Sequence, residues 1–328
     1  MEFLLQKEDL LKELRVFKKI KYINPVLKDI LKIYSNNGSL FLTSSNVDMT
    51  VQTKVDADIK DCKNPLYFNL SLLHLIVSRL PKNSVICFRE NKNKVQIKSE
   101  ETQYSLVKLN GEYSHLNQIF SFEFEKNLSI KFGRLRDTLL KAIKFTKLNS
   151  DNYTVLSGVN FNLNNFLKIS STNSHFLFTS KLDSLRREKE FVMNLNSSDL
   201  KVLSGLDASR FADVNISFSS SINAVKFTVD KYIFYFAKMP DEFPKFGGIL
   251  NSAIKENKNE IVVEKDSILS EVKKAKQVND DVVILYSLLI KIFLLLGSKA
   301  TPVQKSSWRS VVGMRWPEVI YQEVNKAG

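Results

Sequence analysis

Three stretches of the chain carry a pair of basic side chains at matching positions. The stretches are 8–20, 136–148 and 265–278, and they align at Leu11, Leu140 and Leu269, evenly spaced by 129 residues. Four and seven residues beyond these leucines stand the basic side chains Arg15, Lys18, Lys144, Lys147, Lys273 and Lys276. Positions three apart are neighbours on a helix surface, so each stretch presents two cations together. Such pairs hold phosphate groups by charge alone.

The net charge of +13 also fits an anionic partner, and nucleic acid is the commonest one. Two simpler causes would produce basic residues without any such partner. A chain rich in Lys, Asn and Ile would be basic if its genome were rich in A and T, and any amphipathic helix turns a charged face to solvent. The recurrence of the cations in three stretches favours a track along a regular polyanion.

The basic stretches belong to a longer internal repeat. Each has apolar residues at helical spacing, for example Leu10, Leu14 and Phe17, which predicts three equivalent amphipathic helices. Asn46 aligns with Asn173, and the predicted second helices 72–80 and 198–206 align as well. The phrase "TQYSLVKLNGEYSHL" (102–116) returns as "YIFYFAKMPDEFPKF" (232–246). One unit is therefore about 125–130 residues, which is the size of a typical domain.

The rest of each unit has the pattern of strands. Apolar and polar residues alternate in 85–90, 95–100, 214–219 and 224–229, as expected of strands with one face on a core. Many strands with two helices per unit, and no strand-helix-strand alternation, predict an α+β fold in which the helices pack on antiparallel sheet. We predict two complete copies and a partial third, with domains 1–121, 122–250 and 251–328.

The sequence argues against catalysis. The histidines His74, His115 and His175 are scattered, which predicts no metal site, and no Gly-rich phosphate loop or nucleophile motif predicts a cofactor or a catalytic residue. Cys62 and Cys87 form no CxxC pair, and the start of the chain does not read as a leader, so we expect a cytoplasmic protein. The apolar run 282–296 is shorter than the about 20 residues of a bilayer span, so we expect no membrane partner.

The chain resembles the beta subunit of bacterial DNA polymerase III, the sliding clamp. The likeness covers roughly residues 1–281, and its motifs stand in the family's order. They are "EDLLKEL", "INPVLKDILKIYSNNGSLFLTSSNVDM", "VLSGVNF", "LKISSTNSHFL" and "FPKFGGIL". The resemblance implies a non-catalytic processivity factor, a homodimeric ring around double-stranded DNA with helices lining the hole. The implied protein partners are the polymerase III catalytic subunit, the clamp loader and other proteins with a clamp-binding motif.

The resemblance also implies particular site residues. Lys21 and Tyr153 would be loop contacts to DNA, although Tyr153 is equally well an ordinary loop aromatic. The wall of an apolar peptide-binding cleft would be Leu156, Thr172, Ser174, His175, Phe176, Leu177, Pro244 and Ile249. The family commonly has Gly-His-Arg where this chain has Ser174-His175-Phe176, which changes the expected shape of the cleft. The dimer interface would join Tyr104 and Leu106 to Gln277 and Val278 of a second copy.

The third unit departs from the family near Asp281. The segment that follows lacks the expected alternating strands, and the chain ends short of a full third unit. We interpret this as a reading-frame change or a truncation. The alternative function is then a clamp remnant that folds in two domains without closing a ring and acts at most as a peptide-binding adaptor.

Overall fold

The computed structural model describes most of the first 248 residues. The described residues are 1–22, 29–46, 48–61, 64–109, 113, 116, 122–147, 155–164, 166–184, 191–219, 221–248, 251, 265–266 and 269–270. Those from Met1 to Phe243 form one compact unit, and those from Pro244 on belong to a second. In the second unit, 265–266 and 269–270 are helical and lie inside the stretch predicted as the third basic helix. The three domain boundaries predicted from the sequence stay a prediction.

The first half of the first unit passes twice through one order of elements: a strand, a helix and three strands. The first pass comprises β1 (Glu2–Gln6), α1 (Lys7–Phe17), β2 (Ile30–Asn36), β3 (Ser39–Ser45) and β4 (Met49–Val55). The second comprises β6 (Leu66–Asn69), α2 (Leu70–Arg79), β7 (Val85–Asn91), β8 (Lys94–Ser99) and β9 (Thr102–Val107). A short strand between them, β5 (Asp58–Asp61), pairs with β1. We call this half the first repeat.

The second half follows the same order. Its first pass comprises β10 (Glu125–Lys131), α3 (Phe132–Lys144), the 3-10 helix η3 (Val155–Ser157), β11 (Gly158–Leu163), β12 (Phe166–Thr172) and β13 (Leu177–Ser184). Its second comprises β14 (Phe191–Asn196), α4 (Ser197–Ser204), the 3-10 helix η4 (Ala208–Arg210), β15 (Asp213–Ser219), β16 (Ala224–Val229) and β17 (Tyr232–Ala237). We call this half the second repeat. The predicted α+β class with two helices per repeat is confirmed.

The leading strand of each pass pairs with the other pass of the same repeat. β1 pairs with β7 and β6 with β2, while β10 pairs with β15 and β14 with β11, all antiparallel. Two exchanged strands therefore connect the two passes of each repeat. Because the exchanged strands run directly into the helices, the helices are anchored at their N-terminal ends.

One sheet runs through both repeats. Its order is β10-β15-β16-β17-β4-β3-β2-β6, and the other two sheets are β5-β1-β7-β8-β9 and β13-β12-β11-β14. The link is the antiparallel pair β17–β4, in which Tyr232 faces Thr53 and Phe236 faces Met49. The similar segments 102–116 and 232–246 contain β9 and β17, and these two strands each end a repeat. β17 lies between two strands and is buried, whereas β9 is at a sheet edge, where Val107 is 73% exposed.

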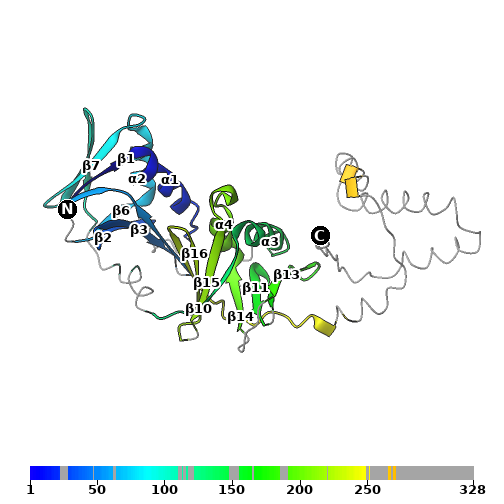
Figure 1. Cartoon of the computed structure of the whole chain (residues 1–328). Helices are drawn as coiled ribbons and strands as arrows, with labels where there is room; N and C mark the ends of the chain where they lie inside the picture. Colours follow the sequence, from blue (N-terminus) through cyan, green and yellow to red (C-terminus); the bar gives the residue numbers. More distant parts are fainter. Residues whose placement is uncertain are drawn as a thin grey trace, which may run out of the picture. The chain divides into compact units, whose positions relative to one another are not determined.

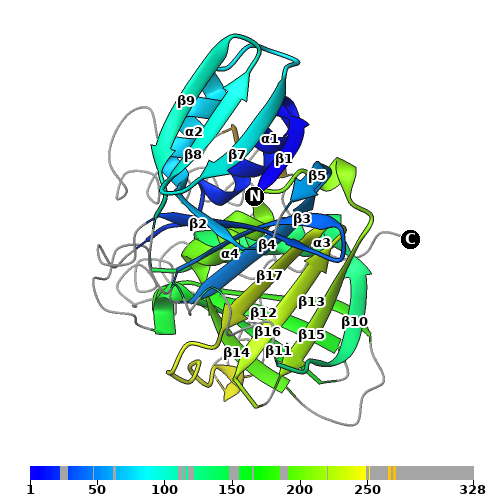
Figure 2. The same ribbon diagram turned by 90° about the vertical axis from the view of Figure 1, so that its left-hand side faces the viewer.

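The helices cover one side of the sheets. In Figures 1 and 2, α1, α2, α3 and α4 lie on one side of the first unit, while β7, β8, β9 and β15, β16, β17 stand on the other. The predicted apolar stripe is buried, because Leu14 and Phe17 of α1 and Leu139 of α3 are fully inaccessible to solvent. Among the described residues, no helix is long and apolar enough to cross a membrane.

An ion pair and two hydrogen bonds connect the two repeats in addition to the β17–β4 pair. Lys231 Nζ lies 2.7 Å from the Oε1 atom of Glu13, a carboxylate buried on α1. Asn46 Nδ2 donates to Asp199 Oδ1 at 2.9 Å, and Lys19 Nζ donates to the Gly205 carbonyl at 3.0 Å. These contacts join α1 to the turn between β16 and β17, α4 to the turn between β3 and β4, and the end of α1 to the C-cap of α4. We call this set, with the β17–β4 pair, the repeat joint.

Candidate nucleic-acid interface and peptide cleft

Arg15 and Lys144 lie in the last turns of α1 and α3, and Lys18 caps α1, but Lys147 lies three residues past the end of α3, so the predicted pair on one helix surface is wrong for α3. Arg15, Lys18, Lys144 and Lys147 are all exposed, while the leucines on the other face of each helix are buried. Lys18 is the C-cap of α1, where its N–H donates to the Leu14 carbonyl, and the Lys147 N–H donates to the Leu156 carbonyl at 2.8 Å. Cations at helix C-termini also offset the negative end of the helix dipole. The structure therefore presents both pairs to solvent on the helical side.

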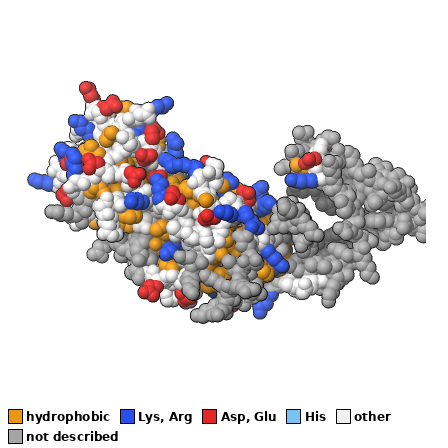
Figure 3. Space-filling view, in the orientation of Figure 1, with side chains coloured by type: hydrophobic (Ala, Val, Ile, Leu, Met, Phe, Trp, Pro, Cys, Tyr) orange, Lys and Arg blue, Asp and Glu red, His pale blue; other side chains and the backbone are white. Residues whose placement is uncertain are grey.

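The basic face extends beyond the predicted residues. Lys201 of α4 and Arg79 of α2 are exposed cations on the helices, and Lys19 reaches across the repeat joint. Figure 3 shows Lys and Arg side chains along the edge of the first unit that carries α1, α4 and α3. Lys201 could have been found from the sequence, because it lies in 198–206, the predicted second helix of its repeat. Lys19, two residues past α1, bonds to Gly205, the C-cap of α4, so the C-terminal ends of these two helices meet on the helical side of the first unit.

Three of the predicted DNA contacts, Tyr153, Lys273 and Lys276, lie outside the described residues. Lys21 is exposed just after α1, and its carbonyl accepts from Asn46 Nδ2 at 2.9 Å. The described residues also contain no group of His, Cys, Asp and Glu that could hold a metal ion. The described helical face offers exposed cations on long side chains, a chemistry suited to phosphate groups.

The predicted cleft residues gather around the turn between β12 and β13. Asn173 Oδ1 accepts the N–H groups of His175 at 3.0 Å and Phe176 at 2.8 Å, and Thr172 Oγ1 donates to the Phe176 carbonyl at 2.7 Å. Asn46 makes the same pattern in the first repeat, accepting from the N–H groups of Asp48 and Met49. The turn is therefore a repeated structural feature, as the alignment of the two asparagines predicts.

Aromatic rings support the wall beside this turn. Phe176 contacts Phe145 edge-on with ring centroids 6.5 Å apart, and Phe145 stacks on Phe178 at 5.7 Å. Leu156 and Leu177 are half-buried, and Ser174 and His175 are exposed. Pro244 is exposed and belongs to the second unit, and Ile249 lies outside the described residues. Five of the eight predicted cleft residues thus lie at this turn, and the Leu156 carbonyl bonds to Lys147, two residues after Phe145.

Ser174 carries backbone strain in this turn. Its φ is +77°, a left-handed conformation that a residue with a Cβ adopts at a cost. We expect Ser174→Gly to raise the free energy of unfolding by about 0.5–1 kcal/mol, because glycine removes that cost. Urea denaturation measures it. The matched control is Asn37→Gly at φ +49°, where little gain is expected because asparagine tolerates this region. Equal gains at both positions would contradict the strain at Ser174.

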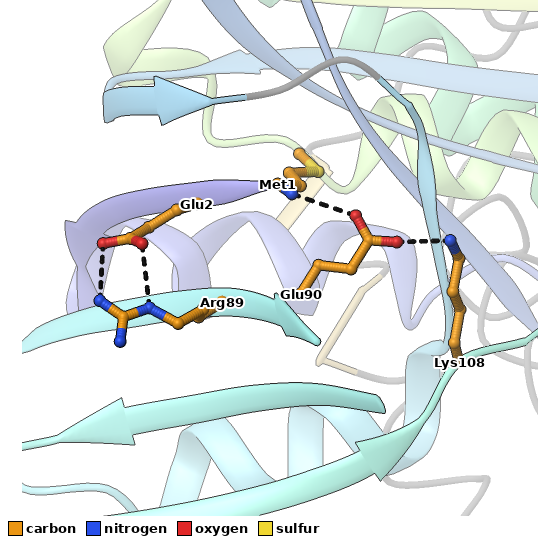
Figure 4. A network of polar contacts seen from close by, with 5 residues as sticks. All are labelled: Met1, Glu2, Arg89, Glu90 and Lys108. Atoms are coloured by element: carbon orange, nitrogen blue, oxygen red, sulfur yellow. Dashed lines mark hydrogen bonds and ion pairs between the residues drawn. The ribbon is translucent and has the colours of Figure 1, made fainter. Parts of the chain in front are cut away.

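Two of the four predicted dimer-interface residues lie on the edge strand β9. Tyr104 and Leu106 are half-buried there, and Gln277 and Val278 lie outside the described residues. Ion pairs hold the neighbouring strands in place (Figure 4). Glu90 contacts the Met1 amino group at 3.1 Å and the Lys108 ammonium, and Arg89 Nε donates to Glu2 Oε2 at 2.9 Å.

The electrostatics of these pairs favour their charged forms. The Lys108 hydrogen bond lowers the pKa of Glu90, and the Arg89 hydrogen bond lowers the pKa of Glu2. Lys108 directly follows β9, while Glu90 lies on β7 and Met1 precedes β1. The network therefore connects three neighbouring parts of the five-stranded sheet and fixes the position of its β9 edge.

The DNA sliding-clamp fold is defined by repeated passes of a strand, a helix and three strands. Its sheets continue from one repeat to the next, and its helices cover one side of them. Solved structures with this fold include the DNA polymerase III subunit beta from Pseudomonas aeruginosa, with 18% identity and a TM-score of 0.72 over 86% of this chain and 75% of that chain. The sliding clamp from Bacillus subtilis has 19% identity and a TM-score of 0.71 over 86% and 75%. The beta subunit from Streptococcus pyogenes has 18% identity and a TM-score of 0.71 over 85% and 74%.

The likeness to beta clamps noted from the sequence is thus confirmed in the fold. No protein-family model and no curated protein sequence matches this chain. At identities below one fifth, agreement over 86% of the chain rests on the arrangement of elements more than on shared residues.

Proposed function

We propose that this chain is a DNA polymerase processivity factor that encircles duplex DNA. The observation that carries the proposal is that each repeat exposes two cations at or just beyond the C-terminal end of its first helix, within a clamp fold. A ring retains DNA by topology, so its inner surface needs only weak contacts to phosphates, which permit sliding. Strong base readout would stop that movement. The role is non-catalytic, and its compartment is the cytoplasm, where bacterial DNA is replicated.

Ring closure in this proposal uses sheet edges. β9 and β13 are edge strands of the first unit, and an exposed edge is stabilised when another strand pairs with it. The pair β17–β4 is an example of such a junction within the chain. We propose that β9 pairs with a second copy in a homodimer, through Tyr104 and Leu106 on one side and Gln277 and Val278 on the other.

The partner site of the proposed clamp is the cleft beside the Asn173 turn. Half-buried Leu156 and Leu177 with the ring of Phe176 would receive apolar anchors of an extended peptide, the usual way in which short motifs gain affinity. The P. aeruginosa clamp structure is a complex with griselimycin, which shows that a clamp of this fold binds a ligand. The proposed partners are the polymerase III catalytic subunit, the clamp loader and other proteins that carry the clamp-binding motif.

One observation favours the alternative of an adaptor that does not close a ring. The residues from Met1 to Phe243 form a compact unit of their own, and the repeat joint holds the two repeats within it. Two repeats could then present the cleft wall without a complete third repeat. Light scattering on the full chain distinguishes the two, because the clamp is a dimer and the adaptor a monomer at all concentrations.

Duplex binding tests the main proposal. Fluorescence anisotropy with two duplexes of unrelated sequence should give equal affinities, and log K should fall linearly with log salt at about 0.9 units per phosphate contacted. A preference for one sequence, or no binding at low salt, would contradict a charge-based sliding surface.

A further inference from the structure

A histidine stands among the cations of the first repeat. Lys18 at the end of α1 donates from Nζ to Ser71 Oγ of α2 at 2.9 Å, which shows that side chains of the two helices meet there. His74 lies three residues beyond Ser71, so it shares that face of α2. It is half-buried, while Arg15 and Lys18 are exposed. The neighbouring helices thus form a cluster of Arg15, Lys18, Ser71 and His74, which we call the His74 cluster.

The surroundings of His74 favour its neutral form. Partial burial, followed by the charges of Lys18 and Arg15, lowers its pKa below the usual value. On α2 itself, Arg79 adds a further cation near the other end of the helix. The nearby carboxylate is Asp29, which accepts the Ser71 N–H at 3.0 Å and so lies behind the serine, at the start of α2. In the free protein these surroundings therefore bias the imidazole towards its uncharged form.

We propose that His74 is a proton-linked phosphate contact, which takes a proton from solvent when a phosphodiester of duplex DNA reaches Arg15 and Lys18. This inference rests on the proposed function. A bound phosphate adds negative charge beside two cations, so it removes the repulsion that keeps the imidazole neutral and favours its protonation. The protonated ring becomes the third cation of the His74 cluster. Duplex binding then takes up a proton and strengthens as the pH falls.

The test measures duplex affinity of the full chain from about pH 8 to about pH 6, the range in which imidazoles titrate. Phosphodiesters keep their charge throughout this range, so the change reports on the protein. We expect affinity to increase by about three- to sixfold at the lower pH, which corresponds to a pKa rise of about one unit on binding. Calorimetry in buffers of different ionisation enthalpy should show proton uptake.

Two variants of the same residue provide the comparison. His74→Gln should bind with the affinity of the neutral form and lose the extra pH dependence, whereas His74→Lys should bind tightly at both pH values. If His74→Gln keeps the full pH dependence and the same proton uptake as the parent chain, the inference is wrong, although DNA binding itself would stand. If the parent chain binds no duplex at either pH, the proposed function fails instead. Circular dichroism confirms that both variants are folded.

Discussion

Replacing Asp199 by asparagine is expected to raise the free energy of unfolding at pH 8 by about 2–4 kcal/mol, since each unit of pKa shift corresponds to 1.36 kcal/mol. Asp199 is only 2% exposed, and its Oδ1 accepts from Asn46 across the repeat joint. Burial, opposed by the Asn46 hydrogen bond, raises its pKa to about 7. Asparagine keeps an acceptor for Asn46 and cannot ionise.

The sign of the pH dependence follows from this shift. A carboxyl whose pKa is raised on folding contributes its full stability below the unfolded pKa of about 3.9, and that stability is lost as the pH rises towards about 7. The gain from Asp199→Asn should therefore be small near pH 4 and largest above pH 7. Urea denaturation at a series of pH values measures it.

A second aspartate provides the control for this series. Asp207 is exposed, and the hydrogen bonds from Ser209 lower its pKa. Asp207→Asn should therefore give no gain that grows with pH. An Asp199→Asn variant that is no more stable than the parent at pH 8 would show that Asp199 is not a buried acid.

Reversing the charge of Arg15, Lys144 and Lys147 together is expected to weaken duplex binding by about two to three orders of magnitude at low salt. Each of these side chains is exposed on the helical face, and each phosphate contact that the variant removes should reduce the salt slope by about one unit. Anisotropy titrations at several salt concentrations measure both quantities.

The matched control reverses three exposed lysines of the strands, Lys54, Lys94 and Lys98. It changes the net charge by the same amount but leaves α1 and α3 intact. The control should weaken binding much less, because more distant charges are screened by salt. Equally weakened binding in the two triple variants would indicate that net charge, rather than the helical face, determines affinity.

The repeats and helices were predictable from local patterns. α1 begins one residue before the predicted stretch 8–20 and ends three residues before its end, and the α+β class is confirmed, because apolar periodicity follows burial in both helices and strands. The register of the aligned leucines is less regular. Leu11 is buried, but its aligned partner Leu140 is 37% exposed, and α3 begins and ends four residues before the predicted stretch. The Lys147 N–H bonds to Leu156 instead of continuing the helix.

The repeat joint could not be predicted from such patterns. Asn46 and Asp199 are 153 residues apart, and each looks like an ordinary turn or cap residue in its own segment. Glu13 occupies a position that helix periodicity does not distinguish from an exposed one, and its buried carboxylate has its partners Lys231 and Tyr232 in the second repeat. Contacts between repeats depend on how β17 and β4 pair within the shared sheet, which local sequence does not encode.

Retention on circular DNA tests the central claim most directly. The full chain is loaded on a nicked circular duplex by a clamp loader with ATP, washed at physiological salt, and then followed before and after the circle is cut. A ring that holds DNA by topology should stay on the circle and leave once free ends exist. Equal retention on circular and linear DNA, or no retention on the circle despite binding to short duplexes, would contradict the proposed clamp.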